Sequence, residues 1–486
     1  MVGISSYAGY IPRYRLNRMT VFGAMGWLNP VLIAAARGEK AVCNFDEDAL
    51  TMAVTAGIEC LKGFEREDLE AVYFASTTAP YRERQNAGIV AAALYAPEEI
   101  RSVDFAGSLK AGTGALLAAL EFVAAGNGSK AVVCAGDCRL GKAGSVQEMY
   151  FGDAGAAMLL SDDEVIAEFK GSYSMTRDFV DHMRGSDTRY DRQWEERWIR
   201  DFGYARFIPW AIEGLCAKYG LSTDDFSKVI YPCYLGGARR RIDAELGLEP
   251  EQVQDSMQES VGDSGAPHPL LMLARALEEA VPGDRLLLVS YGNGCDALYF
   301  EVTEAITAFK ERERVSRWLK RRADLDSHHK YLVWRDMIPA DAGLRGEEDY
   351  TTRWTLEWRE HKAILGLEGT VCRACGTQQW PPRRVCINPE CGAVDEMDEV
   401  CIAEKGGTIF TFTSDLLAAT LNPPNIYGNV KFEGGGRAMF DFTDCILEDC
   451  AVGKPVDFSF RIKFYDPRRD ITFYFWKAVP AQEEVV

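Results

Sequence analysis

The sequence contains no long apolar run, five histidines in all and a deficit of basic residues. None of its hydrophobic stretches reaches the roughly 20 residues that span a bilayer, and its first residues lack the charged and then apolar pattern of a signal peptide. Lys and Arg number 54 against 73 Asp and Glu, a formal net charge of −19, so the chain lacks the basic field that nucleic acid requires. We therefore expect a cytoplasmic protein that binds neither nucleic acid nor a membrane.

The length and the cysteine content are the first positive features. A chain of 486 residues is longer than one hydrophobic core usually supports, which predicts two or three domains. Many of the 14 cysteines lie in apolar contexts and are expected to be buried, reduced thiols; examples are Cys43, Cys60, Cys134, Cys216 and Cys233.

Residues 1–305 alternate short apolar runs with amphipathic stretches, which predicts a layered α/β domain. A helical pattern followed by a buried strand at 110–136 recurs in the same order at 268–292, so we expect two similar halves. The runs expected to be buried strands are 71–76, 130–136, 156–161, 228–232 and 285–292.

The rest of the chain differs from residues 1–305 in composition and hydrophobic pattern. Residues 306–365 are rich in charge and helical in pattern, and we interpret them as a connector in which His328, His329 and His361 are solvated. Residues 401–486 contain strand-like runs separated by Gly, Pro and Asn turns. That pattern fits a small Greek-key barrel of the OB type.

Residues 366–400 hold four clustered cysteines, in the pairs Cys372-x2-Cys375 and Cys386-x4-Cys391. Two such pairs can close a tetrahedron of thiolates around Zn²⁺. The second pair is wider than the usual C-x2-C, and a metal-free ribbon or disulfides are the alternatives. Because four thiolates leave no open coordination position, the zinc would be structural.

Two parts of the chain resemble known families. Over about residues 335–480, the ribbon with its WPPRRVC segment and the following barrel resemble DUF35-type modules, in which a rubredoxin-like zinc ribbon precedes an OB-fold. Residues 1–305 resemble the thiolase superfamily, and within it the hydroxymethylglutaryl-CoA synthase branch, through GISSYAGYIPRYRL, SLKAGT, FGDAGAAMLL and GDSGAPHPLLMLARALEEAVPGDRLLLVSYGNGCDAL. The resemblance implies a duplicated five-layer αβαβα fold, a homodimer, an acyl-CoA substrate and, for the DUF35 part, association with a thiolase-family subunit.

The same resemblance implies that residues of the synthase machinery are replaced in this chain. The family's active cysteine precedes Lys-Ala-Gly-Thr, and Leu109 stands in its place. Thr77 stands at the position of the family's glutamate, Tyr231 or Pro232 at that of its histidine, and Asp263 at that of its asparagine. Four departures in one pocket argue against the cysteine-dependent synthase reaction.

Other residues near these positions carry possible chemistry. Ser108 could accept an acyl group if a base were within hydrogen-bond reach; its alternative role is to cap the helix that starts near Lys110. His268 lies at a strand-to-helix turn, where a neutral imidazole could act as general base or oxyanion donor, or could be bonded to backbone. His182 is interpreted as a loop histidine.

Tyr291 closes an apolar run close to where thiolases carry their second, acid–base cysteine. Some thiolase-like proteins that pair with DUF35 modules are aldolases that use tyrosines, and Tyr291, with Tyr231 as a second candidate, fits this role. A core position is the alternative for each. Asp263 faces the same turn and would raise the pKa of His268 if the two met.

Ligand binding has weaker candidates. Gly112, Gly292 and Gly294 would let backbone N–H groups approach a thioester oxygen, although strand turns need glycine in any case. Arg239 begins a run of three arginines that could meet CoA phosphates or form a solvated helix face.

Two functions fit these observations. The first is an acyltransferase or C–C lyase that makes or breaks a C–C bond, by Claisen or aldol chemistry, on an acyl-CoA thioester. The second is a non-catalytic subunit that binds acyl-CoA or acts as a scaffold for a thiolase partner. Retention of His268 and of the glycine-rich strand ends favours the enzyme.

Overall fold

The computed structural model describes residues 1–309, 311–341 and 353–481. The chain divides into two compact units. The first consists of residues 1–43, 48–91 and 97–331, and the second of residues 44–47, 92–96 and 332–486. Every helix in the described ranges is too short or too polar to cross a membrane.

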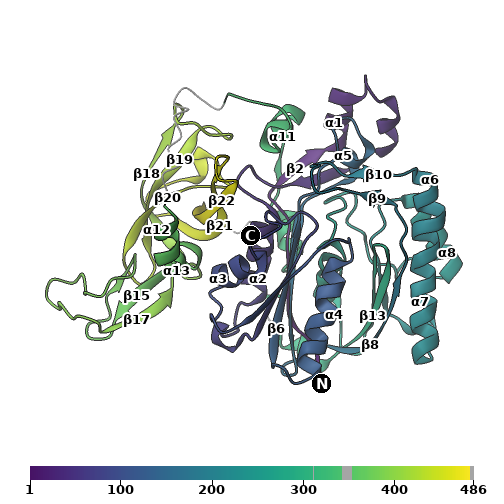
Figure 1. Cartoon of the computed structure of the whole chain (residues 1–486), viewed down its shortest axis with the longest axis horizontal. Helices are drawn as coiled ribbons and strands as arrows, with labels where there is room; N and C mark the ends of the chain where they lie inside the picture. Colours follow the sequence, from purple (N-terminus) through teal and green to yellow (C-terminus); the bar gives the residue numbers. More distant parts are fainter. Residues whose placement is uncertain (310, 342–352, 482–486) are drawn as a thin grey trace. The chain divides into compact units, whose positions relative to one another are not determined.

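The first unit is built on a nine-stranded mixed sheet with the strand order β11-β12-β13-β8-β1-β7-β6-β4-β5 (Figure 1). The five apolar runs expected to be buried strands are β4, β6, β7, β11 and β12. The strand bounds are Gly3–Tyr10 (β1), Ala71–Ala75 (β4), Arg101–Phe105 (β5), Lys130–Asp137 (β6), Ala154–Ser161 (β7), Ala167–Thr176 (β8), Lys228–Ile230 (β11), Arg285–Tyr291 (β12) and Gly294–Val302 (β13).

Two halves of this sheet repeat one pairing scheme. In one half β4 runs parallel to β6, whereas β6–β7 and β7–β1 are antiparallel. In the other half β11 runs parallel to β12, whereas β12–β13 and β13–β8 are antiparallel. The halves join where Gly3 and Ile4 of β1 pair with Glu168 and Ala167 of β8. The repeated order of helix and strand in the sequence thus has a counterpart in the sheet.

Helices pack against each half-sheet. Helix α2 (Ala49–Cys60) packs on β6, β7 and β1, and α7 (Ala205–Tyr219) packs on β12, β13 and β8. Helix α4 (Ala111–Ala124) packs on β4, β5, β6 and β7. Helix α9 (His268–Glu279) contacts α4 and strands of both halves, β7 and β1 as well as β11 and β12.

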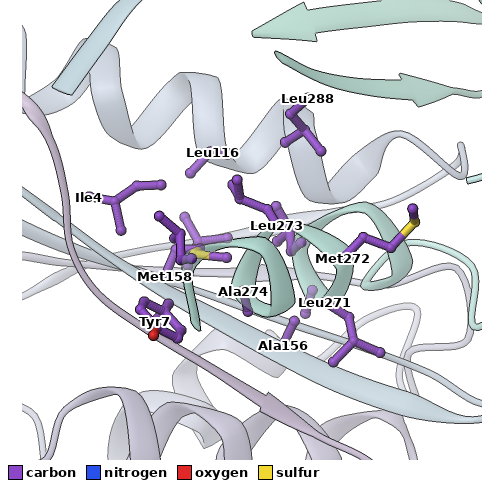
Figure 2. Close-up of a cluster of buried hydrophobic side chains, with 14 of the residues drawn as sticks. Ile4, Tyr7, Leu116, Ala156, Met158, Leu271, Met272, Leu273, Ala274 and Leu288 are labelled. Atoms are coloured by element: carbon purple, nitrogen blue, oxygen red, sulfur yellow. The ribbon is translucent and has the colours of Figure 1, made fainter. Parts of the chain in front are cut away.

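Helix α9 is buried on nearly all sides. Residues 270–274 are fully shielded from solvent, and Figure 2 shows the side chains of residues 271–274 among Ile4, Met158, Leu116 and Leu288. This position explains why the helix carries a nearly continuous apolar run instead of a single apolar stripe. Full burial of one Leu side chain contributes about 1.5–3 kcal/mol, so α9 is a major source of core stability.

The segment predicted to be a polar connector is divided between the two units. Ala323–Asp324 (β14) pairs with β2 (Tyr14–Asn17), and the first unit continues to Tyr331. His328 is 3% exposed, and its Nε2 lies 2.7 Å from Glu148 Oε1. The prediction that His328 is solvated is therefore wrong, because a carboxylate distant in sequence compensates for the burial of the ring.

The second unit contains two small sheets. The first is a ribbon of β15 (Glu368–Cys372), β16 (Gln378–Gln379) and β17 (Met397–Cys401). The second has the order β20-β19-β18-β21-β22, and a parallel bridge between Phe442 and Ala478 brings its two outer strands together. Its strands are Gly407–Asp415 (β18), Asn425–Phe432 (β19), Arg437–Asp441 (β20), Pro455–Asp466 (β21) and Ile471–Pro480 (β22).

Candidate active site and zinc centre

A pocket lies in the first unit at the start of α4. A second pocket shares Leu109, Tyr204, Tyr234 and Asp263 with it, so the two are neighbouring spaces with common walls. We name them chamber 1 and chamber 2. Chamber 1 is further lined by Pro232, Cys233, Gln258, Gly265, His268, Pro269 and Tyr291. Chamber 2 is further lined by Arg139, Phe151, Asp181, His182, Asp191, Gln193 and Ile199.

Leu109 lies between the two chambers at the N-terminal end of α4. It directly precedes Lys110, the N-cap of the helix, and supplies an apolar side chain without nucleophilic chemistry. Ser108 Oγ donates a hydrogen bond to the carbonyl oxygen of Gly292 at 2.9 Å and accepts one from Lys110 N at 3.3 Å. Ser108 therefore braces the start of α4 against the turn after β12, and its role as an acyl acceptor stays a prediction.

Tyr291 ends β12 and lines chamber 1. Its ring stacks on Tyr204, with centroids 4.2 Å apart, and its buried hydroxyl faces the carboxylate of Asp181 without a well-formed hydrogen bond to any described residue. Burial, and then the negative charge and the hydrogen-bonding contact of Asp181, raise the pKa of Tyr291 far above its usual range. Burial also raises the pKa of Tyr204 and Tyr234. At neutral pH these phenols are protonated, so they can donate a hydrogen bond to a ligand but cannot act as bases.

His268 begins α9 and also lines chamber 1. Its Nδ1 lies 3.0 Å from Ser264 Oγ, and its Nε2 lies 2.9 Å from the carbonyl oxygen of Ser256. Because a carbonyl oxygen can only accept, Nε2 carries the proton, and burial lowers the pKa of His268 so that the ring is neutral. Both ring nitrogens are thus bonded to the protein, and a catalytic role of His268 stays a prediction.

Asp263 belongs to a buried ion cluster. Its Oδ2 lies 3.3 Å from Arg139 Nη1, and Arg139 Nη2 lies 3.0 Å from Asp191 Oδ2. The guanidinium also stacks on the ring of Phe151 at 3.9 Å. Arg139 and Asp191 are not predicted from the sequence. The one local signal is that Arg139 follows a buried strand, β6, by two residues.

The other residues that the resemblance assigns to family positions bond to neighbouring side chains or line the pocket. Thr77 Oγ1 donates a hydrogen bond to Asp137 Oδ2 at 2.9 Å. The Tyr231 hydroxyl donates to Asp243 of helix α8 (Gly236–Leu246), so Pro232 is the residue of this pair that lines chamber 1. The structure therefore places Tyr231 outside both chambers.

Chamber 1 also contains a thiol. Cys233 is 5% exposed, as expected of a buried cysteine, and its Sγ lies 3.5 Å from the carbonyl oxygen of Leu235. Burial raises the pKa of Cys233 to about 12. The thiol is protonated at neutral pH and is a poor nucleophile, because the thiolate is the reactive form.

The residues expected to bind the cofactor have structural roles. A Cβ at Gly112 would lie 2.3 Å from the carbonyl oxygen of Ala266, so this glycine permits the close approach of α4 to the start of α9. The N–H of Gly292 is bonded to the carbonyl oxygen of Gly294 at 2.9 Å. Arg239 donates to two backbone carbonyls and lines neither chamber. Their roles in ligand binding stay predictions.

The four clustered cysteines of the second unit form a site that fits zinc. Their four sulfur atoms lie within 4.8 Å of one another, with 3.8 Å between the sulfurs of Cys372 and Cys391 and 3.5 Å between those of Cys375 and Cys386. A tetrahedron with Zn–S bonds of about 2.3 Å has edges of about 3.8 Å. The donor set and its geometry thus fit a structural Zn²⁺, held by Cys372, Cys375, Cys386 and Cys391.

The repeated sheet, the paired helices α4 and α9, and a pocket at the start of α4 define an α/β domain of the thiolase superfamily, and the second unit carries a zinc ribbon. The chain belongs to the hydroxymethylglutaryl-CoA synthase family of that superfamily. It is 33% identical over 317 residues to the hydroxymethylglutaryl-CoA synthase of Methanopyrus kandleri, covering 64% of this chain and 90% of the relative. It is 30% identical over 352 residues to the synthase of Pyrococcus horikoshii, covering 68% and 97%.

Solved structures show the same fold. A structure of HMG-CoA synthase complexed with CoA matches 72% of this chain and 95% of its own, with a TM-score of 0.61 and 19% identity. A structure of Xanthomonas campestris OleA matches 62% and 96%, with a TM-score of 0.55 and 16% identity. Residues 359–396 match the family of the ChsH2 rubredoxin-like zinc ribbon domain, which agrees with the four-cysteine site.

Proposed function

We propose that this chain is an acyl-CoA enzyme that makes or breaks a C–C bond, by Claisen or aldol chemistry, in a pocket without the usual nucleophilic cysteine. Relatives named hydroxymethylglutaryl-CoA synthase, and a synthase structure complexed with CoA, support a CoA thioester as the substrate. The observation that carries the proposal is the protonated hydroxyl of Tyr291, which makes no well-formed hydrogen bond to the described residues and lies in the chamber that Leu109 lines.

A buried hydroxyl that lacks a well-formed hydrogen bond costs up to about 1–3 kcal/mol, which a suitable ligand atom can recover. The carbonyl oxygen of a thioester is such an acceptor. It gains negative charge when the neighbouring carbon loses a proton, and preorganised donors stabilise that charge most strongly in a site shielded from water. Tyr204 lines the same chamber and stacks on Tyr291, so a second phenol is available there.

An aldol step needs no acyl-enzyme. A base removes a proton from the carbon next to the thioester carbonyl, and the electron pair of that C–H bond forms the enolate. The enolate carbon then bonds to the carbonyl carbon of an aldehyde or ketone, whose oxygen takes up a proton. The reverse sequence breaks the same bond. The chemistry agrees with Leu109 at the nucleophile's position and with a Cys233 thiol that stays protonated.

The second candidate is a non-catalytic subunit that binds acyl-CoA or acts as a scaffold for a thiolase. It is favoured by the engagement of Thr77 with Asp137 and of both nitrogens of His268 with the protein. In this function Tyr291 would hold the thioester oxygen without a subsequent reaction.

Proton exchange in D₂O separates the two functions. Acetyl-CoA and butyryl-CoA are incubated with the protein, deuterium at the α-carbon is followed by mass spectrometry, and binding is measured by calorimetry. If the chain is an enzyme, we expect both binding and deuterium exchange. The exchange rate should be reduced about 10²–10³-fold in Tyr291→Phe, the loss expected for one oxyanion donor. Binding without exchange supports the non-catalytic subunit, and absence of binding refutes both. An acyl group found on Cys233 would refute the cysteine-independent mechanism.

The architecture has finer features that we also propose. The halves of the nine-stranded sheet, with α4 and α9 packed together, support a duplicated five-layer αβαβα arrangement for residues 1–305. The bridge between the outer strands of the five-stranded sheet supports an OB-fold over residues 401–486, preceded by a zinc ribbon at 366–400 and a helical connector at 306–365. A homodimer, and association with a separate thiolase subunit, complete the proposal. The zinc would stabilise the ribbon and take no part in the reaction.

A further inference from the structure

Removal of a proton from an acyl-CoA requires a base, and the residues considered so far do not supply one. The ring nitrogens of His268 are both engaged, and the phenols of chamber 1 are protonated. We propose that His182 removes and returns the α-proton, and that Asp191 positions its ring. This inference rests on the proposed function and names the acid–base residue of that site.

A short hairpin carries both residues into chamber 2. Strand β9 (His182–Met183) pairs with β10 (Arg192–Gln193), and Gln193 lies opposite His182. Trp194 N donates to the carbonyl oxygen of Asp181 at 2.8 Å, which fixes the base of the hairpin. The side chain of His182 is 22% exposed, and that of Asp191 is 6% exposed. An imidazole ring that is partly exposed to solvent and lies next to a buried carboxylate is a suitable arrangement for an acid–base histidine.

The contacts of Asp191 determine the tautomer of His182. Asp191 Oδ2 lies 3.0 Å from Arg139 Nη2 and 3.0 Å from His182 Nδ1. Although burial by itself raises the pKa of Asp191, Arg139 and His182 hold this pKa below its ordinary value, so the carboxylate is ionised. An ionised carboxylate can only accept, and therefore Nδ1 donates the hydrogen bond. The lone pair of the neutral ring is then on Nε2.

The Nε2 atom makes no hydrogen bond to the described residues and is available to a ligand. The neighbouring carboxylate oxygen, Asp181 Oδ1, is 3.9 Å away, beyond hydrogen-bond distance. Asp191 is held in turn by Arg139, which also binds Asp263, so the orientation of the ring is supported by a buried ion cluster. When Nε2 takes up a proton, the adjacent carboxylate stabilises the imidazolium.

The proposed acid, Tyr291, and the proposed base, His182, line neighbouring chambers that share lining residues. Chamber 2 contains His182, chamber 1 contains Tyr291, and Leu109 and Tyr204 line both. A thioester beside Leu109 can thus meet a phenol at its carbonyl oxygen and an imidazole at its α-carbon. The proton taken by Nε2 is returned to the alkoxide of the aldol product, or to the α-carbon after C–C cleavage, so no other proton donor or acceptor is required.

The test compares deuterium exchange into acetyl-CoA and butyryl-CoA for four proteins: wild type, His182→Gln, Asp191→Asn and His329→Gln. We expect His182→Gln to reduce exchange about 10²–10⁴-fold, the usual contribution of general acid–base catalysis, with unchanged acyl-CoA affinity. Asp191→Asn should reduce the exchange rate about tenfold or more without weakening binding, because an amide no longer selects the tautomer. His329 is exposed and lines neither chamber, so its variant should exchange like wild type.

Chemical rescue distinguishes the missing base from a distorted pocket. Imidazole in the buffer should restore part of the exchange to His182→Ala and none to Tyr291→Phe. If wild type exchanges and His182→Gln exchanges equally fast, the assignment of His182 is overturned while the proposed function stands. If the wild-type protein binds neither thioester, or exchanges the α-proton of neither, the assignment of His182 and the proposed enzymatic function are both overturned. Loss of exchange in His182→Ala without any rescue by imidazole would assign His182 a structural role and refute its role as base.

Discussion

Replacing Arg139 with methionine removes the cation that two buried carboxylates share. Arg139, Asp191 and Asp263 have side chains that are 5%, 6% and 12% exposed. Methionine keeps most of the volume and can still contact the ring of Phe151, so the substitution tests charge more than packing. Loss of one partner from a buried ion pair costs about 3–5 kcal/mol, because the remaining charge is desolvated without compensation.

The expected loss of folding stability in Arg139→Met should depend on pH and should be larger at neutral than at acidic pH. In the wild type the pKa of Asp191 lies below its value in the unfolded chain, so its ionisation stabilises the fold above about pH 4. Without Arg139, burial drives the pKa of the carboxylate upward, and ionisation then opposes folding. The difference in stability between the two proteins should be full at pH 7–8 and should shrink as the pH falls toward 4, because the carboxylates of the variant take up protons.

Thermal unfolding followed by circular dichroism measures the effect. At about 2 °C per kcal/mol for a large domain, Arg139→Met should lower the apparent Tm of the first unit by about 6–10 °C at pH 7.5 and by much less at pH 4.5. Arg37→Met is the matched control, since Arg37 and its partner Glu259 are 85% and 58% exposed and such surface pairs contribute about 0–1 kcal/mol. A Tm shift below 2 °C for Arg139→Met, or a shift that grows as the pH falls, would refute the electrostatic reasoning.

Three further predictions concern the core, the zinc site and His268. Leu273→Ala should lower stability by about 2–5 kcal/mol because the Leu273 side chain is fully buried, whereas Leu356→Ala, at a residue 44% exposed, should change it by about 0.5 kcal/mol or less in denaturant titrations. Metal analysis should find one equivalent of zinc per chain and its loss in Cys372→Ser, with unfolding of the ribbon visible by proteolysis; an unchanged zinc content would contradict the ligand assignment. Because burial lowers the pKa of His268, stability should fall as the pH drops below about 6.5, where the unfolded chain takes up a proton that the folded chain excludes. His268→Gln should flatten this slope, and an identical slope would exclude His268 as its source.

Much of the secondary structure follows from local pattern. Apolar runs of five to eight residues bounded by polar turns gave β4, β6, β7, β11 and β12, because a strand buried on both faces needs apolar side chains throughout. The zinc ligands followed from the spacing of Cys372, Cys375, Cys386 and Cys391, since two short knuckles are enough to define a tetrahedron.

The candidate site depended much less on local pattern. Resemblance located Leu109 and Tyr291, but the neighbourhood of each polar group is set by segments far apart in the chain. Arg139 and Asp191 are separated by 52 positions, and His328 and Glu148 by 180. No periodicity joins such residues, and so His328 was expected to be solvated.

The sequence by itself determined the family, five buried strands of the first unit and the four zinc ligands. The tertiary structure alone decided which groups are bonded to the protein. Both nitrogens of His268 are hydrogen-bonded, whereas Nε2 of His182 and the hydroxyl of Tyr291 make no well-formed hydrogen bond within the described part of the chain. The physical reason is that hydrophobic pattern is fixed within a few residues of the chain. Desolvation, hydrogen bonding and charge pairing depend instead on every segment that converges on a buried atom.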